Sequence, residues 1–245
     1  PDLVRFSKQK HSVWVQWWFD LLAVNYPDPL EQHPRFAWIS QLLRAMDAVF
    51  VKERPLLSEY RSHEINAHYL DQGCPANIKQ APDLPKLWDV LLFGQGGEYY
   101  RQRAADIQSL VGAGLKVAWA GHSAQGCESL PWTHPDELPS LCGQARFVLC
   151  VDRRHDIDGY FSDRFWLACG MGCAVVKRFS PGVPAGPYRS YGTQEELTRI
   201  VLGMTNEESR EMGKRARAWV MQSHTIEHRV QSLLSAVPSV TALAL

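Results

Sequence analysis

Short apolar runs alternate along the chain with stretches in which apolar residues recur at helical spacing. His11–Asp20, Ala48–Val51 and Ala67–Leu70 have the length and the β-branched or aromatic content of buried strands. Between them, Pro34–Met46 carries apolar residues three and four positions apart, which predicts a helix, and Glu53–His63 predicts a second one. The first part of the chain is therefore expected to form three strands connected through helices.

A proline-rich stretch over residues 75–85 has no such pattern and predicts a linker. Beyond it the alternation resumes, with predicted strands at Trp88–Phe93, Lys116–Ala120, Phe147–Val151 and Cys173–Lys177, and predicted helices at Tyr99–Val111, Asp136–Cys142, from about Ser162, and from Gln194 onward. Strands that alternate with helices favour an α/β fold with parallel sheets and right-handed crossovers. We expect two Rossmann-like lobes, a small one over residues 1–80 and a larger one over residues 81–234, followed by a tail over residues 235–245.

Composition and charge exclude several classes of protein. The 26 Lys and Arg balance the 26 Asp and Glu, which argues against a strongly basic nucleic-acid binder. No apolar run approaches the roughly 20 residues of a membrane-spanning helix, and no secretory signal is visible at the start. The six cysteines lack C-x-x-C spacing and the nine histidines lack metal-ligand spacing. We therefore expect reduced thiols, a cytoplasmic protein and no metal site.

In a parallel sheet, ligands bind outside the carboxyl ends of the strands. The loop Gly94, Gln95, Gly96 and Gly97 follows one predicted strand and precedes a helix, so its backbone N–H groups can approach a phosphate. Arg103, farther along that helix, can add positive charge to the same anion. The structural alternatives are a plain tight turn for the glycine loop and a solvated helix face for Arg103. His122 follows another strand and is a candidate site contact.

A second candidate segment starts the helix near residue 162. Ser162 and Asp163 are suited to cap that helix, and Arg164 can bind an anion at the helix N-terminus together with them. The alternative is a purely structural cap, with Arg164 paired to a nearby acid. Asp20, at the end of the first aromatic strand, is a candidate base or acceptor-positioning carboxylate, with a structural turn as the alternative.

The order of these features resembles the group-1-type glycosyltransferases of the GT-B fold, in particular the branch with spore-maturation-like and phage-borne members. The resemblance rests on Asp89–Gly94 with Arg103, on Gly159–Gly172, and on Glu195–Leu197 with His224–Arg229. Trp17–Asp20, Asp47–Val51 and His68–Leu70 are similar to the later part of the family's acceptor-binding lobe, so the first lobe is expected to be shortened. Gly159 and Leu167 stand where many members carry two glutamates, and Asp158 and Asp163 are nearby substitutes.

The resemblance implies a retaining, metal-independent hexosyltransferase that uses a UDP-type nucleotide sugar as co-substrate and binds no cofactor tightly. Gly94–Gly97, Arg103 and Arg164 would neutralise the diphosphate leaving group, Tyr160 and Ser162 would position phosphates and sugar, and Asp20 would act on the acceptor side. Phage-type relatives include enzymes that glycosylate hydroxymethylated bases in DNA, so such DNA is one acceptor considered, beside small molecules, proteins and polysaccharides. The rival reading is a non-catalytic nucleotide-binding or partner-binding module of the same fold.

Overall fold

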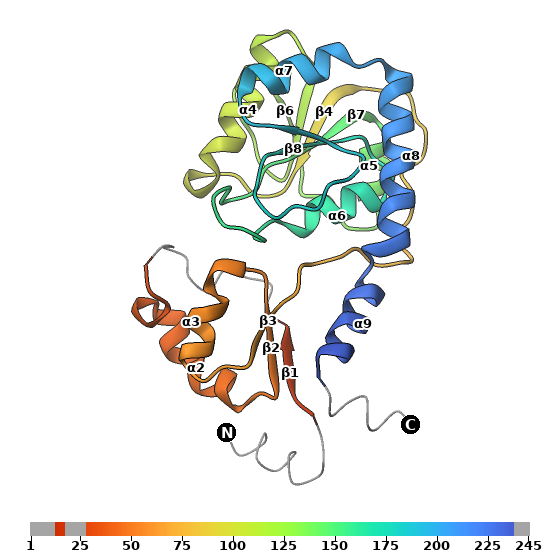
Figure 1. Ribbon diagram of the computed structural model, residues 1–245. Coiled ribbons are helices and arrows are strands. Elements are labelled where there is room, and N and C mark those ends of the chain that lie inside the picture. Colours follow the sequence, from red (N-terminus) through yellow and green to blue (C-terminus); the bar gives the residue numbers. More distant parts are fainter. Residues whose placement is uncertain (1–12, 18–27, 238–245) are drawn as a thin grey trace. The chain divides into compact units, whose positions relative to one another are not determined.

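The structure of the protein is a computed structural model that describes residues 13–17 and 28–237. The chain divides into two compact units (Figure 1). Unit 1 takes the chain up to Gln72, the short segment Asp156–Tyr160 and the chain from Ile226 onward. Unit 2 takes Gly73–His155 and Phe161–Thr225. The segment Asp156–Tyr160 thus interrupts unit 2 and packs with unit 1.

Unit 1 contains a parallel sheet in the order β1-β2-β3, made of Val15–Trp17, Ala48–Val51 and Ala67–Tyr69. Its helices are α2 (Pro34–Ala45), α3 (Leu57–Ser62) and α9 (Ile226–Ala236), with single 3₁₀ turns at Leu30–Gln32 and Arg54–Leu56. Apolar side chains of α2 and α3 cover one face of the sheet, while Leu233 of α9 packs against Phe50 of β2 in a separate cluster. Each face is therefore buried, as a parallel sheet requires.

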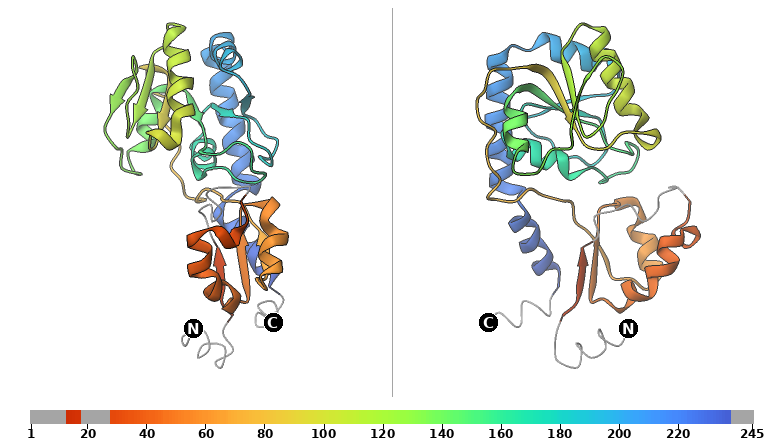
Figure 2. Two further views of the ribbon diagram at one scale, coloured as in Figure 1. Left: turned by 90° about the vertical axis from the view of Figure 1, so that its left-hand side faces the viewer. Right: turned by 180° about the vertical axis from the view of Figure 1, so that it is seen from behind.

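Unit 2 contains a six-stranded parallel sheet in the order β6-β5-β4-β7-β8-β9. The strands are β4 (Trp88–Phe93), β5 (Val117–Ala120), β6 (Glu128–Leu130), β7 (Ala145–Cys150), β8 (Val175–Arg178) and β9 (Arg189–Tyr191). The helices are α4 (Arg101–Gly112), α5 (Leu138–Gly143), α6 (Asp163–Gly170), α7 (Gln194–Gly203) and α8 (Asn206–Ser223), and a 3₁₀ turn at Glu98–Tyr100 precedes α4. The alternation of strands and helices can be followed along the colour gradient in Figure 2.

Two apolar clusters hold the helices of unit 2 on opposite faces of its sheet. Ile107 of α4 and Leu197 of α7 pack in one cluster with Val90 and Trp119 of the sheet. On the other face, α5, α6 and α8 contribute buried residues that include Phe165 and Trp166. Because all six strands run in the same direction, their carboxyl ends meet at one edge, and this edge carries the candidate site.

The α/β fold class with two parallel, Rossmann-like sheets is confirmed. The predicted strands Ala48–Val51 and Trp88–Phe93 have the observed bounds, and the predicted helix from Gln194 breaks at Thr205, where Thr205 and Glu208 form a reciprocal capping box. The sequence pattern missed β6 and β9. Within the described part of the chain, no helix has the length and apolar character needed to cross a bilayer.

Candidate functional site

The glycine loop after β4 has close contacts at two of its glycines. Gly94 has φ +121°, and a Cβ atom there would lie 2.8 Å from Nη1 of Arg164. A Cβ atom on Gly96 would lie 1.8 Å from Cδ2 of His122, within the imidazole ring. The Gly94 carbonyl accepts a 2.8 Å hydrogen bond from the buried Trp119 Nε1. The loop is therefore in contact with Arg164 of α6 and with His122 of the loop after β5.

Arg103, on α4, is 1% exposed and points its guanidinium to the same edge. Its Nε donates to the Val151 carbonyl at 2.9 Å, and its Nη1 donates to the Gln95 carbonyl. Its Nη2 is buried without a hydrogen-bond partner among the described residues. Burial and the nearby charge of Arg164 lower the pKa of Arg103 to about 9. The guanidinium also lies 4.0 Å from the centroid of the Tyr100 ring. An anion that reaches Nη2 would add a charge-assisted hydrogen bond to this buried cation.

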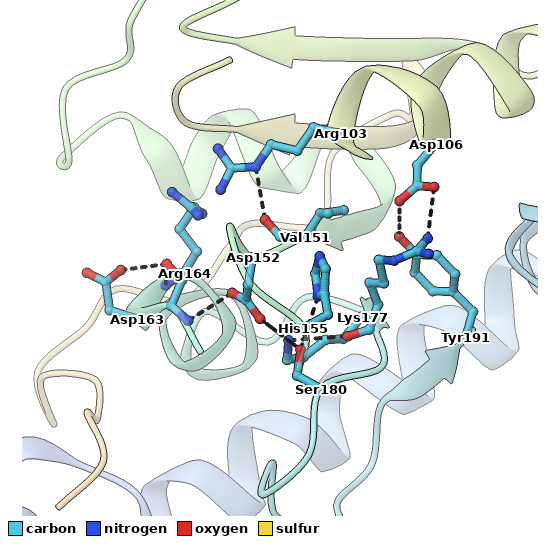
Figure 3. A network of polar contacts seen from close by, with 12 residues as sticks. Arg103, Asp106, Val151, Asp152, His155, Asp163, Arg164, Lys177, Ser180 and Tyr191 are labelled. Atoms are coloured by element: carbon cyan, nitrogen blue, oxygen red, sulfur yellow. Dashed lines mark hydrogen bonds and ion pairs between the residues drawn. The ribbon is translucent and has the colours of Figure 1, made fainter. Parts of the chain in front are cut away.

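Arg164 reaches the same place from the start of α6. Ser162 caps this helix, since its Oγ accepts from the Arg164 backbone N at 3.3 Å, and Asp163 lies in the first turn, as predicted. Ser162 Oγ also donates to Asp163 Oδ1 at 3.0 Å. The structural alternative, in which Arg164 pairs with an acid, is not observed: within the described ranges no ion pair joins Arg103 or Arg164 to a carboxylate. Figure 3 shows the two guanidinium groups side by side.

Asp152 and Lys177 form a buried ion pair beside the two arginines (Figure 3). Asp152 follows β7 and is 3% exposed, and Lys177 lies in β8 and is 1% exposed. Asp152 Oδ1 accepts from the Ser162 backbone N at 2.9 Å, and its Oδ2 accepts from Lys177 Nζ and, at 3.3 Å, from Ser180 Oγ. Burial acts to raise the pKa of the Asp152 carboxyl, but the charge and hydrogen bond of Lys177 outweigh it, so that this pKa lies below its ordinary value.

The sequence pattern did not predict this ion pair. The available signal was the position of two charged residues at the ends of neighbouring apolar strands, one directly after Phe147–Val151 and the other closing Cys173–Lys177. A lone charge in an apolar strand is rarely buried without a partner. That rule identifies both residues as paired, although it does not say with which group.

The remaining predicted site residues are spread over both units. His122 is exposed at the carboxyl end of β5, with its ring 4.8 Å from that of Trp119. Tyr160 belongs to unit 1, whereas Ser162, Asp163 and Arg164 belong to unit 2. The Tyr160 ring lies under Lys52, whose Nζ is 4.5 Å from the ring centroid. Asp20 lies outside the described residues.

The positions of the family's glutamate pair carry no carboxylate. Gly159 has φ +81°, and a Cβ atom there would lie 2.5 Å from Cε2 of Tyr69, so this position admits only glycine. Leu167 lies within α6. Of the nearby acids, Asp158 pairs with Arg54 at 3.1 Å within unit 1. Among the residues that the structure describes, no group of three or more His, Cys, Asp or Glu side chains is arranged to hold a metal ion.

The fold defines a Rossmann-like protein of the GT-B type, and its larger unit carries two buried or half-buried arginines at the carboxyl edge of the sheet. A family model described as glycosyl transferase-like matches residues 78–235, more than half of the chain. The chain therefore belongs to this glycosyl transferase-like family. No curated protein matches the chain.

Solved structures share the fold at low sequence identity. HepE from Anabaena, determined with UDP-glucose, is 13% identical with a TM-score of 0.70, over 96% of this chain and 75% of that one. Sucrose-phosphate synthase from Thermosynechococcus elongatus is 13% identical with a TM-score of 0.67, over 98% of this chain and 71% of that one. WaaG, a glycosyltransferase involved in lipopolysaccharide biosynthesis, is 12% identical with a TM-score of 0.58, over 92% and 75%. At these identities the likeness establishes the fold.

Proposed function

We propose that the protein transfers a sugar from a nucleotide-sugar donor to a hydroxyl acceptor, and that the carboxyl edge of unit 2 binds the donor diphosphate. One observation carries this proposal: the guanidinium groups of Arg103 and Arg164 converge beside the glycine loop without a carboxylate partner in the described part of the chain. Two like charges held together in a protein favour an anion that neutralises both.

Arg103 and Arg164 act on the leaving group in this proposal. When the bond between the sugar and the diphosphate breaks, negative charge grows on the departing phosphate oxygen. Fixed cations placed where that charge develops lower the barrier, because they need no rearrangement during the reaction. The Gly94 N–H donates to the Ala120 carbonyl at 2.9 Å, so the backbone N–H groups that stay predicted diphosphate contacts are those of Gln95, Gly96 and Gly97. Ser162, Asp163, His122 and Tyr160 stay predicted donor contacts, with Asp20 predicted on the acceptor side.

The donor is a UDP-type hexose nucleotide in this account, since HepE structures hold UDP and UDP-glucose. We further propose retention of anomeric configuration without a divalent metal, because protein cations take the place that a metal would have at the diphosphate. The assignment to the spore-maturation-like and phage-borne branch, and the lobe boundaries 1–80, 81–234 and 235–245, rest on sequence alone.

Binding of UDP and UDP-glucose by isothermal titration calorimetry, with and without added Mg²⁺ and with EDTA, tests the donor site. The proposal predicts binding that survives EDTA and is lost in Arg164→Ala at an unchanged melting temperature. Release of UDP from UDP-glucose in the presence of an acceptor panel then tests catalysis, and NMR of the product gives its anomeric configuration. Absence of binding by the folded wild type to any nucleotide sugar would contradict the proposal.

Hydroxymethylated DNA is the acceptor class that we propose for the first assay. Arg35 and Arg44 are exposed on α2, so unit 1 carries cations that can contact DNA phosphates. Trp14 and Trp17, at β1, are half-buried and pack against separate apolar clusters, so they are weaker candidates for stacking on an extruded base. The predicted contacts Lys8, Lys10 and Trp18 lie outside the described residues. Sugar transfer to a hydroxymethylated duplex, but not to the same duplex without the modification, supports this acceptor; transfer only to other acceptors removes it.

A non-catalytic nucleotide-binding or partner-binding module is the second candidate, and the lack of carboxylates at Gly159 and Leu167 favours it. The two candidates differ in turnover. Binding of UDP-glucose without release of UDP, whichever acceptor is added, would support the non-catalytic module.

A further inference from the structure

The exit of β7 connects both arginines of the site to one short stretch of backbone. Val151 and Asp152 are consecutive residues at the carboxyl end of this strand. The Val151 carbonyl accepts the hydrogen bond from Arg103 Nε, and the Asp152 carboxylate accepts the hydrogen bond from the Ser162 backbone N, at 2.9 Å in each case. The Val151 carbonyl therefore binds the Arg103 guanidinium, and the Asp152 side chain binds the backbone at the start of α6.

The start of α6 sets the position of Arg164. Arg164 is the second residue of the helix, and its backbone N is bonded to the N-cap Ser162. Its guanidinium lies against Gly94, within 2.8 Å of the place of a Cβ atom. Because Ser162 caps α6 and bonds the Arg164 backbone N, this N-cap helps to set the position from which the Arg164 side chain extends.

Lys177 offsets the negative charge of the buried Asp152 carboxylate. Without it, the Asp152 carboxylate would be a buried anion within electrostatic reach of Arg103, whose charge it stabilises. Lys177 Nζ bonds the carboxylate, and also donates to Ser180 Oγ at 3.4 Å and to the Arg178 carbonyl at 3.3 Å. The carboxylate is thereby paired with Lys177, which is not part of the proposed anion site. Neither guanidinium group is paired with Asp152, so both can interact with a bound anion.

We propose that Asp152 and Lys177 are a positioning pair: they fix the N-cap of α6, and so hold Arg164 over Gly94, without themselves touching the donor. This inference rests on the proposed function where it concerns the donor. Its structural part, that Asp152 holds the first turn of α6, is testable without any ligand.

The hydrogen bond from Ser162 N to Asp152 can be removed by itself. Ser162 has φ −78°, which a proline can adopt, so Ser162→Pro deletes the N–H donor and leaves the backbone conformation accessible. Ser162→Ala is the matched control, because it also lacks the hydroxyl but keeps the N–H. We expect UDP to bind Ser162→Pro about tenfold more weakly than Ser162→Ala, as expected for loss of a hydrogen bond to a charged group.

A double-mutant cycle shows whether Asp152 acts through Arg164. We expect Asp152→Ala to weaken UDP binding about tenfold in the wild type and by a clearly smaller factor in Arg164→Ala, where only its influence on the charge of Arg103 remains. Asp106→Asn is the control for a general loss of stability, since Asp106 is another fully buried carboxylate of unit 2, with Tyr191, Gln102 and Arg178 as partners. It should lower the melting temperature while UDP affinity, measured well below that temperature, stays within twofold.

Amide hydrogen exchange separates a failure of this inference from a failure of the proposed function. We expect the Phe165 and Trp166 amides to exchange faster in Ser162→Pro than in Ser162→Ala, whether or not UDP binds. If the wild type binds no nucleotide but this difference is present, the proposed function fails and the positioning contact stands. Equal exchange in the two variants, or an equal effect of Asp152→Ala with and without Arg164, overturns the inference.

Discussion

The guanidinium group of Arg164 lies directly against the α-carbon of Gly94, so closely that a Cβ atom at residue 94 would be 2.8 Å from Nη1. Gly94 also has φ +121°, a backbone conformation that other residues rarely adopt. The observed position of the Arg164 guanidinium therefore depends on the absence of a side chain at residue 94. Gly94 thus makes room for Arg164, while its own N–H donates to the Ala120 carbonyl at 2.9 Å.

Substitution of Gly94 by alanine should weaken UDP binding because the new methyl group displaces the Arg164 guanidinium. Gly97→Ala is the matched control: Gly97 also has a positive φ, +93°, but a Cβ atom there meets nothing within 4 Å. Both variants should lose about 1–3 kcal/mol of stability to backbone strain. Only Gly94→Ala should also lose affinity, by about tenfold, in calorimetric titrations with UDP. Equal affinities of the two variants would count against the contact.

Acid should remove the stability that the Asp152 carboxylate contributes. The pKa of this carboxyl lies below its ordinary value in the folded protein, because the charge and hydrogen bond of Lys177 outweigh burial. The contribution is then fully present above the unfolded pKa of about 4 and is lost as the pH falls through the folded pKa. Urea unfolding of wild type and Asp152→Asn across this range should show a difference of about 3–5 kcal/mol near neutral pH that shrinks below pH about 4. A difference that grows on acidification would contradict the ion pair.

Thiol labelling should distinguish one cysteine from the other five. The structure describes all six cysteines and leaves each of them as a free thiol. Cys127 is half-buried, whereas the others are buried, and burial raises the pKa of Cys150 to about 12. A thiol-reactive reagent at pH 8 should therefore modify Cys127 alone in the folded protein, and all six in denaturant, as counted by mass spectrometry. Rapid labelling of Cys150 or Cys169 without unfolding would contradict the packing of unit 2.

The sequence pattern predicted the elements whose burial is carried by apolar residues. Ala48–Val51 is buried at every position, and Trp88–Phe93 is nearly so, which is why continuous apolar runs located both. The strands that were missed, β6 and β9, are three-residue edge strands with exposed polar residues. Such strands exist because a neighbouring strand offers backbone partners, a cause that no local pattern records.

The candidate site was predictable only where a single element defines it. The glycine loop and the Ser162 cap are local features that follow their own sequence rules. The Lys177 partner lies 25 positions from Asp152, and the ring that fits against Gly96 belongs to His122 on the next loop, so both depend on the order of strands in the sheet. Closeness in sequence predicts that Tyr160 and Arg164 belong to the same segment of the site. In the structure, Gly159 packs closely against Tyr69, and Tyr160 belongs to unit 1.

Calorimetric titration of the wild type and of Arg164→Ala with UDP-glucose shows whether the guanidinium groups of Arg103 and Arg164 bind a nucleotide diphosphate. We expect saturable binding by the wild type and a loss of affinity of at least tenfold in Arg164→Ala, with equal melting temperatures of the two proteins in the absence of ligand. Equal affinity of the two proteins, or no binding of any nucleotide sugar by the folded wild type, would contradict the proposed donor site.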